Sequence, residues 1–343
     1  MSARPLTIRG TGLVTSVGLT AAASCCAFRA RITNPCETQF IDSSGAWIMA
    51  HQVNLDRPCA GLTKLAKMAA LAIDEALQDI DQEQWHRLPL LLCVAEAERP
   101  GRLEGLEDQL LTQIQGELGV SFAQQSAVVP LGRVGVAVAL AKARALLDLP
   151  NSLGVLIAGT DSLLSWPTLS HYEREDRLLT ESNSNGFMPG EGAGALWVGA
   201  GEGHLPQLIC TGIGFGRETA HIDSGEPLRA DGLTQAIKAS LEDAGRQLHD
   251  MDFRITDISG EQYYFKEASL ALSRTLRQRK EEFDIWHPAE CTGECGAASG
   301  VAVIAAAREA CHKAYAPGHN ILTHWANDAG QRAAVTFEYR AAA

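Results

Sequence analysis

The stretch GVAVALAKARALL (Gly135–Leu147) recurs as GVAVIAAAREACH (Gly300–His312), at an offset of 165 residues between Gly135 and Gly300. Both stretches begin with glycine and are rich in alanine, and neither has a continuous polar face. A helix that is apolar all round is a buried helix. The pair therefore predicts two equivalent helices inside one core.

Other elements share this offset, which indicates a duplicated chain. Each pair matches in type, helix with helix and strand with strand. The pairs are LAKMAALAIDEAL (Leu65–Leu77) with ADGLTQAIKASLE (Ala230–Glu242), PLLLCVA (Pro89–Ala95) with RITDISG (Arg254–Gly260), and GVLIAG (Gly154–Gly159) with HNILTH (His319–His324).

Short apolar strands that alternate with helices predict α/β layers in which both faces of the strands are covered. Two sheets with the repeated helices between them satisfy this burial. We therefore predict a duplicated α/β fold with an N-terminal half over residues 1–201 and a C-terminal half over residues 202–343.

Composition excludes several classes of protein. The 343 residues are 46% hydrophobic and 20% charged, as in a globular protein, and the net charge of −12 disfavours a nucleic-acid interface. The first nine residues lack the apolar core of a signal peptide, and no apolar run approaches the ~20 residues of a membrane helix. We expect a cytoplasmic protein without a membrane or nucleic-acid partner.

Nine cysteines, an odd number in mostly apolar contexts, indicate buried thiols in a reducing compartment. Cys291 and Cys295 are separated by three residues, and no second cysteine pair at metal-ligand spacing accompanies them. The sequence therefore predicts no metal site and no cofactor.

The glycine-rich segment NGFMPGEGAGALWVG (Asn185–Gly199) fits neither a dinucleotide-binding motif nor a loop that leads into a helix. Its glycines at 190, 192 and 194 allow positive φ angles and close backbone approach before a strand. The segment resembles the D-G-F-x-x-G-E-G-A-G-x-L-V-L signature of the β-ketoacyl synthases. IRGTGLVTSVG (Ile8–Gly18) and VLIAGTDSLLSWPTLSHYER (Val155–Arg174) are similar to other segments of that family.

This resemblance covers nearly the whole chain, in order. It implies a thiolase-like, duplicated αβαβα layered fold. It also implies a structural role for the residues that match the signature, with Glu191 in buried polar support. These residues are Gly186, Phe187, Gly190, Glu191, Gly192 and Gly194.

The residues that carry condensation in this family are missing at the positions the resemblance gives them. A ketosynthase needs a cysteine thiolate at a helix N-terminus to accept the acyl chain. Here VVPLGRVGVAVAL (Val128–Leu140) has Leu131 at or beside that position. Between Val128 and Thr160 the only Cys, Ser or Thr is Ser152. Leucine cannot form an acyl-enzyme.

Both family histidines are also replaced. Gly260 in ISGEQYY (Ile258–Tyr264) stands in the first position, and Glu294 in GECGAASG (Gly293–Gly300) stands in the second. The C-terminal glycine-rich loop of the family reads HWANDAGQR (His324–Arg332) here and keeps only Gly330. We expect Leu131, Gly260 and Glu294 to line one cavity that cannot take an acyl group.

Cys295 is the candidate for a relocated nucleophile, because it begins the second repeated helix, where a thiolate is favoured. Glu294 beside it opposes this by raising the thiol pKa. The alternative is a thiol of the core. His287, His319 and His324 could supply a base, or they are ordinary surface or loop histidines.

The sequence thus predicts a non-catalytic ketosynthase-like protein that acts as a scaffold, pairing subunit or adaptor. Its partner would be a second copy, another thiolase-fold subunit, an acyl carrier protein or a protein cargo, as in type VI secretion. The alternatives are an acyltransferase or condensing enzyme with a relocated nucleophile, and an acyl-chain binding module. We expect pairing through a strand edge, with GVLIAGTDSLLS (Gly154–Ser165) as the pairing segment.

Overall fold

The computed structural model describes residues 5–148, 152–201 and 206–341 of the chain. Its strands are β1 (Leu6–Val14), β2 (Cys36–Ile41), β3 (Trp47–Ala50), β4 (Leu90–Cys93), β5 (Ala127–Val129), β6 (Val155–Ser162), β7 (Glu191–Ala200), β8 (Gln207–Arg217), β9 (Phe253–Thr256), β10 (Ile285–Trp286), β11 (Asn320–Ala326) and β12 (Gln331–Arg340). Its α-helices are α1 (Ala21–Ala30), α2 (Gly61–Ala76), α3 (Leu110–Leu118), α4 (Gly135–Leu147), α5 (Trp166–Arg174), α6 (Asp231–Ala244), α7 (Gln262–Thr275), α8 (Ala289–Thr292) and α9 (Ser299–His312). The 3₁₀ turns are η1 (Gln82–Arg87), η2 (Gly132–Val134), η3 (Leu248–Asp250) and η4 (Gly296–Ala298).

Ten strands form one mixed sheet in the order β10-β9-β11-β12-β8-β1-β7-β6-β4-β5. The two halves of this order repeat the same pattern outward from the centre. In one half β4 pairs parallel with β5 and β6, and in the other β9 pairs parallel with β10 and β11. The halves meet where β1 pairs antiparallel with β8 over Leu6–Ile8.

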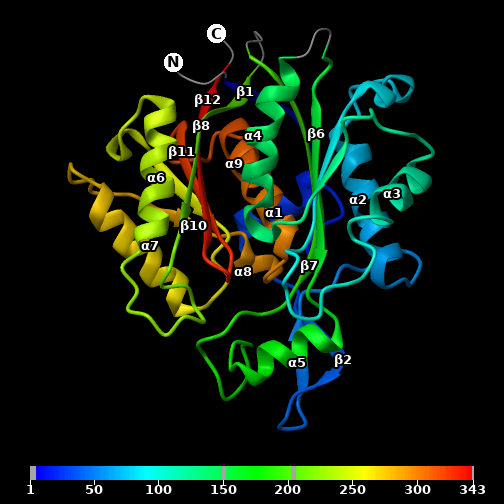
Figure 1. Ribbon diagram of the computed structural model, residues 1–343, viewed down its shortest axis with the longest axis vertical. Helices are drawn as coiled ribbons and strands as arrows, with labels where there is room; N and C mark the ends of the chain where they lie inside the picture. The colour runs from blue at the N-terminus through cyan, green and yellow to red at the C-terminus, as the bar shows by residue number, and fades with distance from the viewer. Residues whose placement is uncertain (1–4, 149–151, 202–205, 342–343) are drawn as a thin grey trace.

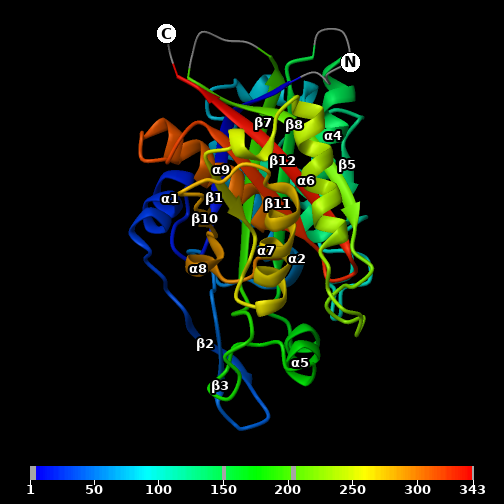
Figure 2. The same cartoon turned by 90° about the vertical axis from the view of Figure 1, so that its left-hand side faces the viewer.

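The sheet curves so that its halves face each other across a layer of central helices (Figure 1). Helices α1, α4 and α9 lie between the halves. Helices α2 and α3 cover the outer face of one half, and α6 and α7 cover the other (Figures 1 and 2). This αβαβα layering is the duplicated α/β architecture that the sequence predicts, and the fold class is confirmed.

Gly300, near the start of α9, allows the two repeated helices to pack closely. A side chain at Gly300 would place its Cβ 2.8 Å from the Cβ of Val136, at the start of the other helix. Contacts that short do not occur between real Cβ atoms, so a larger residue would push α4 and α9 apart. The Gly-Val-Ala-Val repeat is therefore a requirement of the shared core.

The 165-residue offset holds for the central helices and for β6 and β11, but it slips at β4 and β9. Leu90 pairs with Leu156, and Phe253 pairs with Ile321. The offset between Leu156 in β6 and Ile321 in β11 is 165 residues. The offset between their partners, Leu90 in β4 and Phe253 in β9, is 163 residues. A slip of two residues keeps the same side chains on the same face, so it leaves the apolar pattern unchanged.

The prediction that Gly154–Ser165 forms the pairing edge is wrong. This segment contains β6, which pairs with β4 on one side and with β7 on the other. Its apolar character arises from burial on both faces within the sheet. The edge strands are β5 and β10.

The hairpin β2–β3 and helix α5 form a smaller lobe at one end of the layers (Figures 1 and 2). Within the described ranges, no helix combines the length and the apolar character needed to cross a bilayer. The predicted boundary at 201/202 adjoins residues 202–205, which lie outside the described residues.

Candidate functional site

The N-terminal ends of the two repeated helices, α4 and α9, meet beside a small cavity of about 20 Å³. Turn η2 leads into α4 and turn η4 leads into α9. The cavity is lined mainly by charged side chains, together with a few apolar ones: Glu96, Arg99, Arg133, Leu163, Tyr172, Arg177, Phe187, Glu261, Glu294, Gly296 and Asp328. A space of this size holds about one water molecule.

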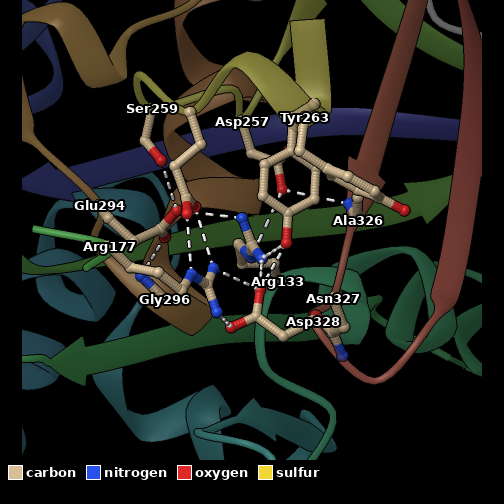
Figure 3. Close-up of polar contacts among 12 residues, drawn as sticks. Arg133, Arg177, Asp257, Ser259, Tyr263, Glu294, Gly296, Ala326, Asn327 and Asp328 are labelled. Carbon is tan, nitrogen blue, oxygen red and sulfur yellow. Dashed lines mark hydrogen bonds and ion pairs between the residues drawn. The ribbon is translucent and has the colours of Figure 1, made fainter. Parts of the chain in front are cut away.

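Arg133 lies at the centre of this site (Figure 3). Its guanidinium donates to Glu294 Oε2 at 3.2 Å and to Asp328 Oδ1 at 2.6 Å. It also donates to the Tyr264 hydroxyl at 2.9 Å, and Asp257 Oδ2 lies 3.9 Å from its Nε. Because Arg133 is only 6% exposed, its charge is compensated inside the protein rather than by solvent.

Arg177 forms a second centre that shares Asp328 with Arg133 (Figure 3). Its guanidinium makes a two-point contact with Glu261, at 2.7 and 2.9 Å. It also donates to Asp328 Oδ2 at 2.8 Å. Paired guanidinium–carboxylate contacts of this kind are strong and directional. Because Asp328 accepts from both guanidinium groups, it bridges the two arginines.

Carboxylates also occupy the start of helix α9. Glu294 Oε1 accepts from the Gly296 amide, and Glu294 Oε2 accepts from the Ser259 hydroxyl, both at 2.9 Å. Asp161 Oδ2 accepts from the Ala297 amide at 2.9 Å, and Arg99 holds Asp161 through contacts of 2.6 and 2.8 Å. Unpaired amides at a helix start attract negative charge. Here the protein's own side chains satisfy them.

The pKa directions follow from burial, which disfavours a charged carboxylate, and from the guanidinium groups that oppose it. Burial raises the pKa of Asp257 to about 7, although Arg133 opposes that shift. Burial also raises the pKa of Glu96. At Asp328 burial acts in the same direction, but Arg133 and Arg177 outweigh it and hold the pKa well below its usual range. Asp328 is therefore the charged partner, and Asp257 is close to half-protonated at neutral pH.

Of the three predicted positions, the structure brings only Glu294 into the cavity. Leu131 is half-buried against the core, and its carbonyl accepts from Asn327 Nδ2 at 2.8 Å. Gly260 is exposed with a φ of 137°, and a Cβ there would lie 2.5 Å from the Gly186 carbonyl oxygen. The expectation that all three line one cavity is wrong. Their neighbours Arg133 and Glu261 line it instead.

Cys295 is buried, and it is not among the residues that line the cavity. Its Sγ lies 3.2 Å from the Thr292 carbonyl oxygen and 3.5 Å from that of Glu191. Burial, reinforced by the charge of Glu294, raises the pKa of this thiol. The thiol form predominates, which disfavours a role as nucleophile.

The three histidines named with Cys295 differ in their surroundings. His324 lies inside β11, so its description as a surface or loop residue is wrong, and burial lowers its pKa to about 3. His287 pairs with Glu290 at 2.8 Å. The ring of His319 packs against the ring of Tyr339.

The signature glycines act through close packing. Gly190, Gly192 and Gly194 all have ordinary negative or extended φ angles, so of the two properties that glycine allows, the structure uses close approach and not positive φ. A Cβ at Gly190 would lie 2.2 Å from the Thr292 carbonyl oxygen, and one at Gly194 would lie 2.5 Å from Val301 Cγ1. The glycines allow β7 to contact the segment that leads into α9.

The other signature residues support the same region. Glu191 is buried and accepts from the Val53 amide, the Ser162 hydroxyl and Lys64. A Cβ at Gly186 would lie 2.4 Å from the Leu178 carbonyl carbon. Phe187 lines the cavity and packs edge-on against Tyr172 at 5.0 Å between ring centroids.

Sequence reasoning missed the residues that fill the site, namely Arg133, Arg177, Asp257, Glu261 and Asp328. One signal was available. Arg133 is the single charge in the otherwise apolar run VVPLGRVGVAVAL, where an unpaired charge is costly. Its partners come from distant segments and carry no local signal.

The arrangement has little capacity for covalent chemistry. In the part of the chain that the structure describes, no cysteine or histidine lines the cavity. Among those same residues, no group of His, Cys, Asp and Glu is arranged to hold a metal ion. The polar groups are already paired with one another, which leaves few free to hold or activate a substrate.

Comparisons with known proteins support the fold. The ishigamide ketosynthase/chain length factor superposes with a TM-score of 0.78 at 16% identity, covering 98% of this chain and 99% of that one. The AntDE:AntF complex, described as a type II PKS acyl-carrier protein with its ketosynthase bound to the hexaketide, gives 0.79 at 13% identity, covering 98% and 99%. A β-ketoacyl synthase from Burkholderia phymatum STM815 gives 0.72 at 14% identity, covering 98% and 100%.

These likenesses establish a thiolase-like ketosynthase fold over the described chain. No family model matches the sequence, and no curated protein matches it. At such low identities the shared fold carries no activity with it.

Proposed function

We propose that this chain is a non-catalytic ketosynthase-like subunit that pairs with a second thiolase-fold subunit. The observation that carries the proposal is the paired network of Arg133, Arg177, Glu261, Glu294 and Asp328 between the starts of the two central helices. It leaves a cavity of about 20 Å³, which is too small for an acyl chain.

The energetics of the network support this proposal. To admit a substrate, the site would have to separate Arg133 from Glu294 and Asp328, all of which are largely buried. Breaking a buried ion pair leaves an uncompensated charge and costs about 3–5 kcal/mol. Such a site is built to remain closed.

The family resemblance and the position of β5 at the end of the sheet indicate the nature of the partner. Chain-length-factor subunits look like ketosynthases, lack the cysteine and pair with an active ketosynthase. One similar solved structure is described as a ketosynthase/chain length factor. Among the strands of the described ranges, β5 pairs with β4 alone and lies at the end of the sheet, which leaves its outer edge to a partner strand.

The alternatives draw less support. A relocated nucleophile needs a reactive thiol, and Cys295 is buried with a raised pKa. An acyl-binding module needs space that the central cavity lacks. A carrier-protein partner has a precedent in one similar structure, whereas none of the three solved structures reported above is described as a secretion protein.

Co-expression tests the proposal. The chain is produced with each thiolase-fold protein encoded beside it in the genome, and complexes are measured by light scattering and by incubation with an acyl thioester. We expect a one-to-one complex in which the acyl group is found on the partner alone. A chain that forms no mixed complex and carries the acyl group itself would overturn the proposal.

A further inference from the structure

A second cavity, open to solvent, is lined by residues of α1, β9, β10, α8 and α9. Its volume is about 230 Å³, and it shares no lining residue with the cavity around Arg133. Helices α1 and α8 and strand β10 lie together on one side of the molecule (Figure 2). The buried side chains of Ile255 and Ala306 contribute to its lining.

Aromatic rings form its walls. Phe28, Trp286 and Tyr315 line the cavity, and each is only partly buried. The rings of Trp286 and Tyr315 lie nearly parallel, with 6.3 Å between centroids and an interplanar angle of 20°. Phe253 packs against Trp286 at 4.8 Å and holds that ring in place. The walls are therefore ordered and suited to a flat apolar group.

The volume sets the size of the occupant. An apolar cavity of about 150 Å³ accommodates one benzene molecule. The space beside Trp286, at about 230 Å³, is large enough for a fused two-ring group. It is too small for a nucleotide or for a folded peptide segment.

Two guanidinium groups stand at the same cavity. Arg29 lies over the Tyr315 ring, 4.6 Å from its centroid, and Arg31 is exposed at the end of α1. Among the described residues, neither guanidinium forms an ion pair or a side-chain hydrogen bond. The nearby carboxylate of Glu290 pairs with His287 at 2.8 Å. In a chain of net charge −12, two unpaired arginines at one cavity favour an anionic ligand.

The geometry points to a binding site for a small aromatic carboxylate. The ring lies among Phe28, Trp286 and Tyr315, and the carboxylate faces Arg29 and Arg31. Planar guanidinium groups match a carboxylate in shape and charge, and they stack on aromatic rings. This site does not depend on the proposed pairing function, because the β5 edge and the Arg133 network are elsewhere in the fold.

Titration of the full chain with 2-naphthoate tests the site. Binding is monitored by tryptophan fluorescence and by calorimetry. We expect saturable one-to-one binding. Arg29→Gln and Arg31→Gln should each weaken it by about tenfold, since each removes a charged contact. The matched control is Arg246→Gln, which changes an exposed arginine on another face and should leave the affinity unchanged.

Two further ligands identify which part of the probe is recognised. The neutral 2-naphthalenemethanol should bind about tenfold more weakly than 2-naphthoate, because it lacks the charge that the arginines recognise. Octanoate should also bind more weakly than 2-naphthoate, because it has no ring to pack against the aromatic walls. Trp286→Leu should weaken the binding of 2-naphthoate but not the binding of octanoate. The thermal melting of this variant shows whether it folds.

The proposal is overturned by any of three results. The first is no saturable binding of 2-naphthoate at about 1 mM. The second is binding that survives the double substitution Arg29→Gln/Arg31→Gln. The third is equal affinity for the neutral alcohol and the acid. The two arginines are exposed, so these substitutions leave the core intact.

Discussion

Arg133 Nη1 donates to Glu294 Oε2 at 3.2 Å, and this contact joins the starts of the two repeated helices across the centre of the molecule. In the β-ketoacyl synthases that the sequence resembles, the corresponding region holds the nucleophile and its histidines. Here a buried contact between opposite charges links the two halves of the duplication, which also share one apolar core. The contact therefore contributes to stability in a place where a related enzyme would bind substrate.

Removing Arg133 is expected to destabilise the fold. Arg133→Met would leave Glu294 and Asp328 facing each other without their shared cation. We expect the free energy of unfolding, measured in urea, to fall by about 3–5 kcal/mol. The control Arg246→Gln breaks an exposed pair with Glu338 and should cost less than about 1 kcal/mol. A small effect of Arg133→Met, equal to that of the control, would contradict a stabilising network.

Asp257 predicts a specific pH dependence. Its pKa is raised from 3.8 to about 7 in the folded chain, so the folded state keeps a proton that the unfolded state has lost. Its contribution to stability is complete below about pH 4 and is lost as the pH rises through 7. Asp257→Asn cannot ionise. Across this window wild type should lose about 4 kcal/mol relative to the variant.

The measurement is urea unfolding of both proteins at several pH values. Asp79→Asn, at an exposed position, is the control for removing one carboxylate. A difference between wild type and Asp257→Asn that does not change with pH would show that Asp257 titrates normally.

Cys295 should be unreactive in the folded protein. Its thiol is 4% exposed and its pKa is raised, whereas Cys26 is exposed. Iodoacetamide followed by peptide mass analysis should modify Cys26 in the native state and Cys295 only after unfolding in urea. Rapid native labelling of Cys295 would revive the hypothesis of a relocated nucleophile.

Pairing is predicted to use β5. Val128 lies in the middle of this edge strand, and a lysine there should block the addition of a partner strand. Val128→Lys should convert dimers into monomers at micromolar concentration, as measured by light scattering. The control Phe215→Lys places the same charge at an exposed position of β8, within the part of that strand that pairs with β12. A wild-type chain that is monomeric under these conditions would refute pairing between copies.

The fold was predictable because its information is local and repeated. The Gly-Val-Ala-Val helices and the strands that follow them keep one offset, and the layers follow from covering apolar strands on both faces. The pairing edge was not predictable in the same way. A strand that is buried within the sheet and a strand that is buried by a partner have the same apolar sequence, as β6 illustrates.

The site was predictable only in part. The sequence indicates the absence of a nucleophile, because Leu131 and its neighbours carry no thiol or hydroxyl. It does not indicate what fills the space. Arg177, Glu261 and Asp328 lie on three separate segments, and each resembles a solvated surface charge until the fold brings them together. Long-range ion pairs leave no periodic pattern in one sequence.

The most direct measurement is the intact mass of the chain after incubation with a short acyl thioester, with an active ketosynthase as the positive control. A closed network around Arg133 predicts an unchanged mass for this chain and an acyl adduct on the control enzyme. A stoichiometric acyl adduct on this chain, lost when the modified cysteine is changed to alanine, would contradict a non-catalytic role.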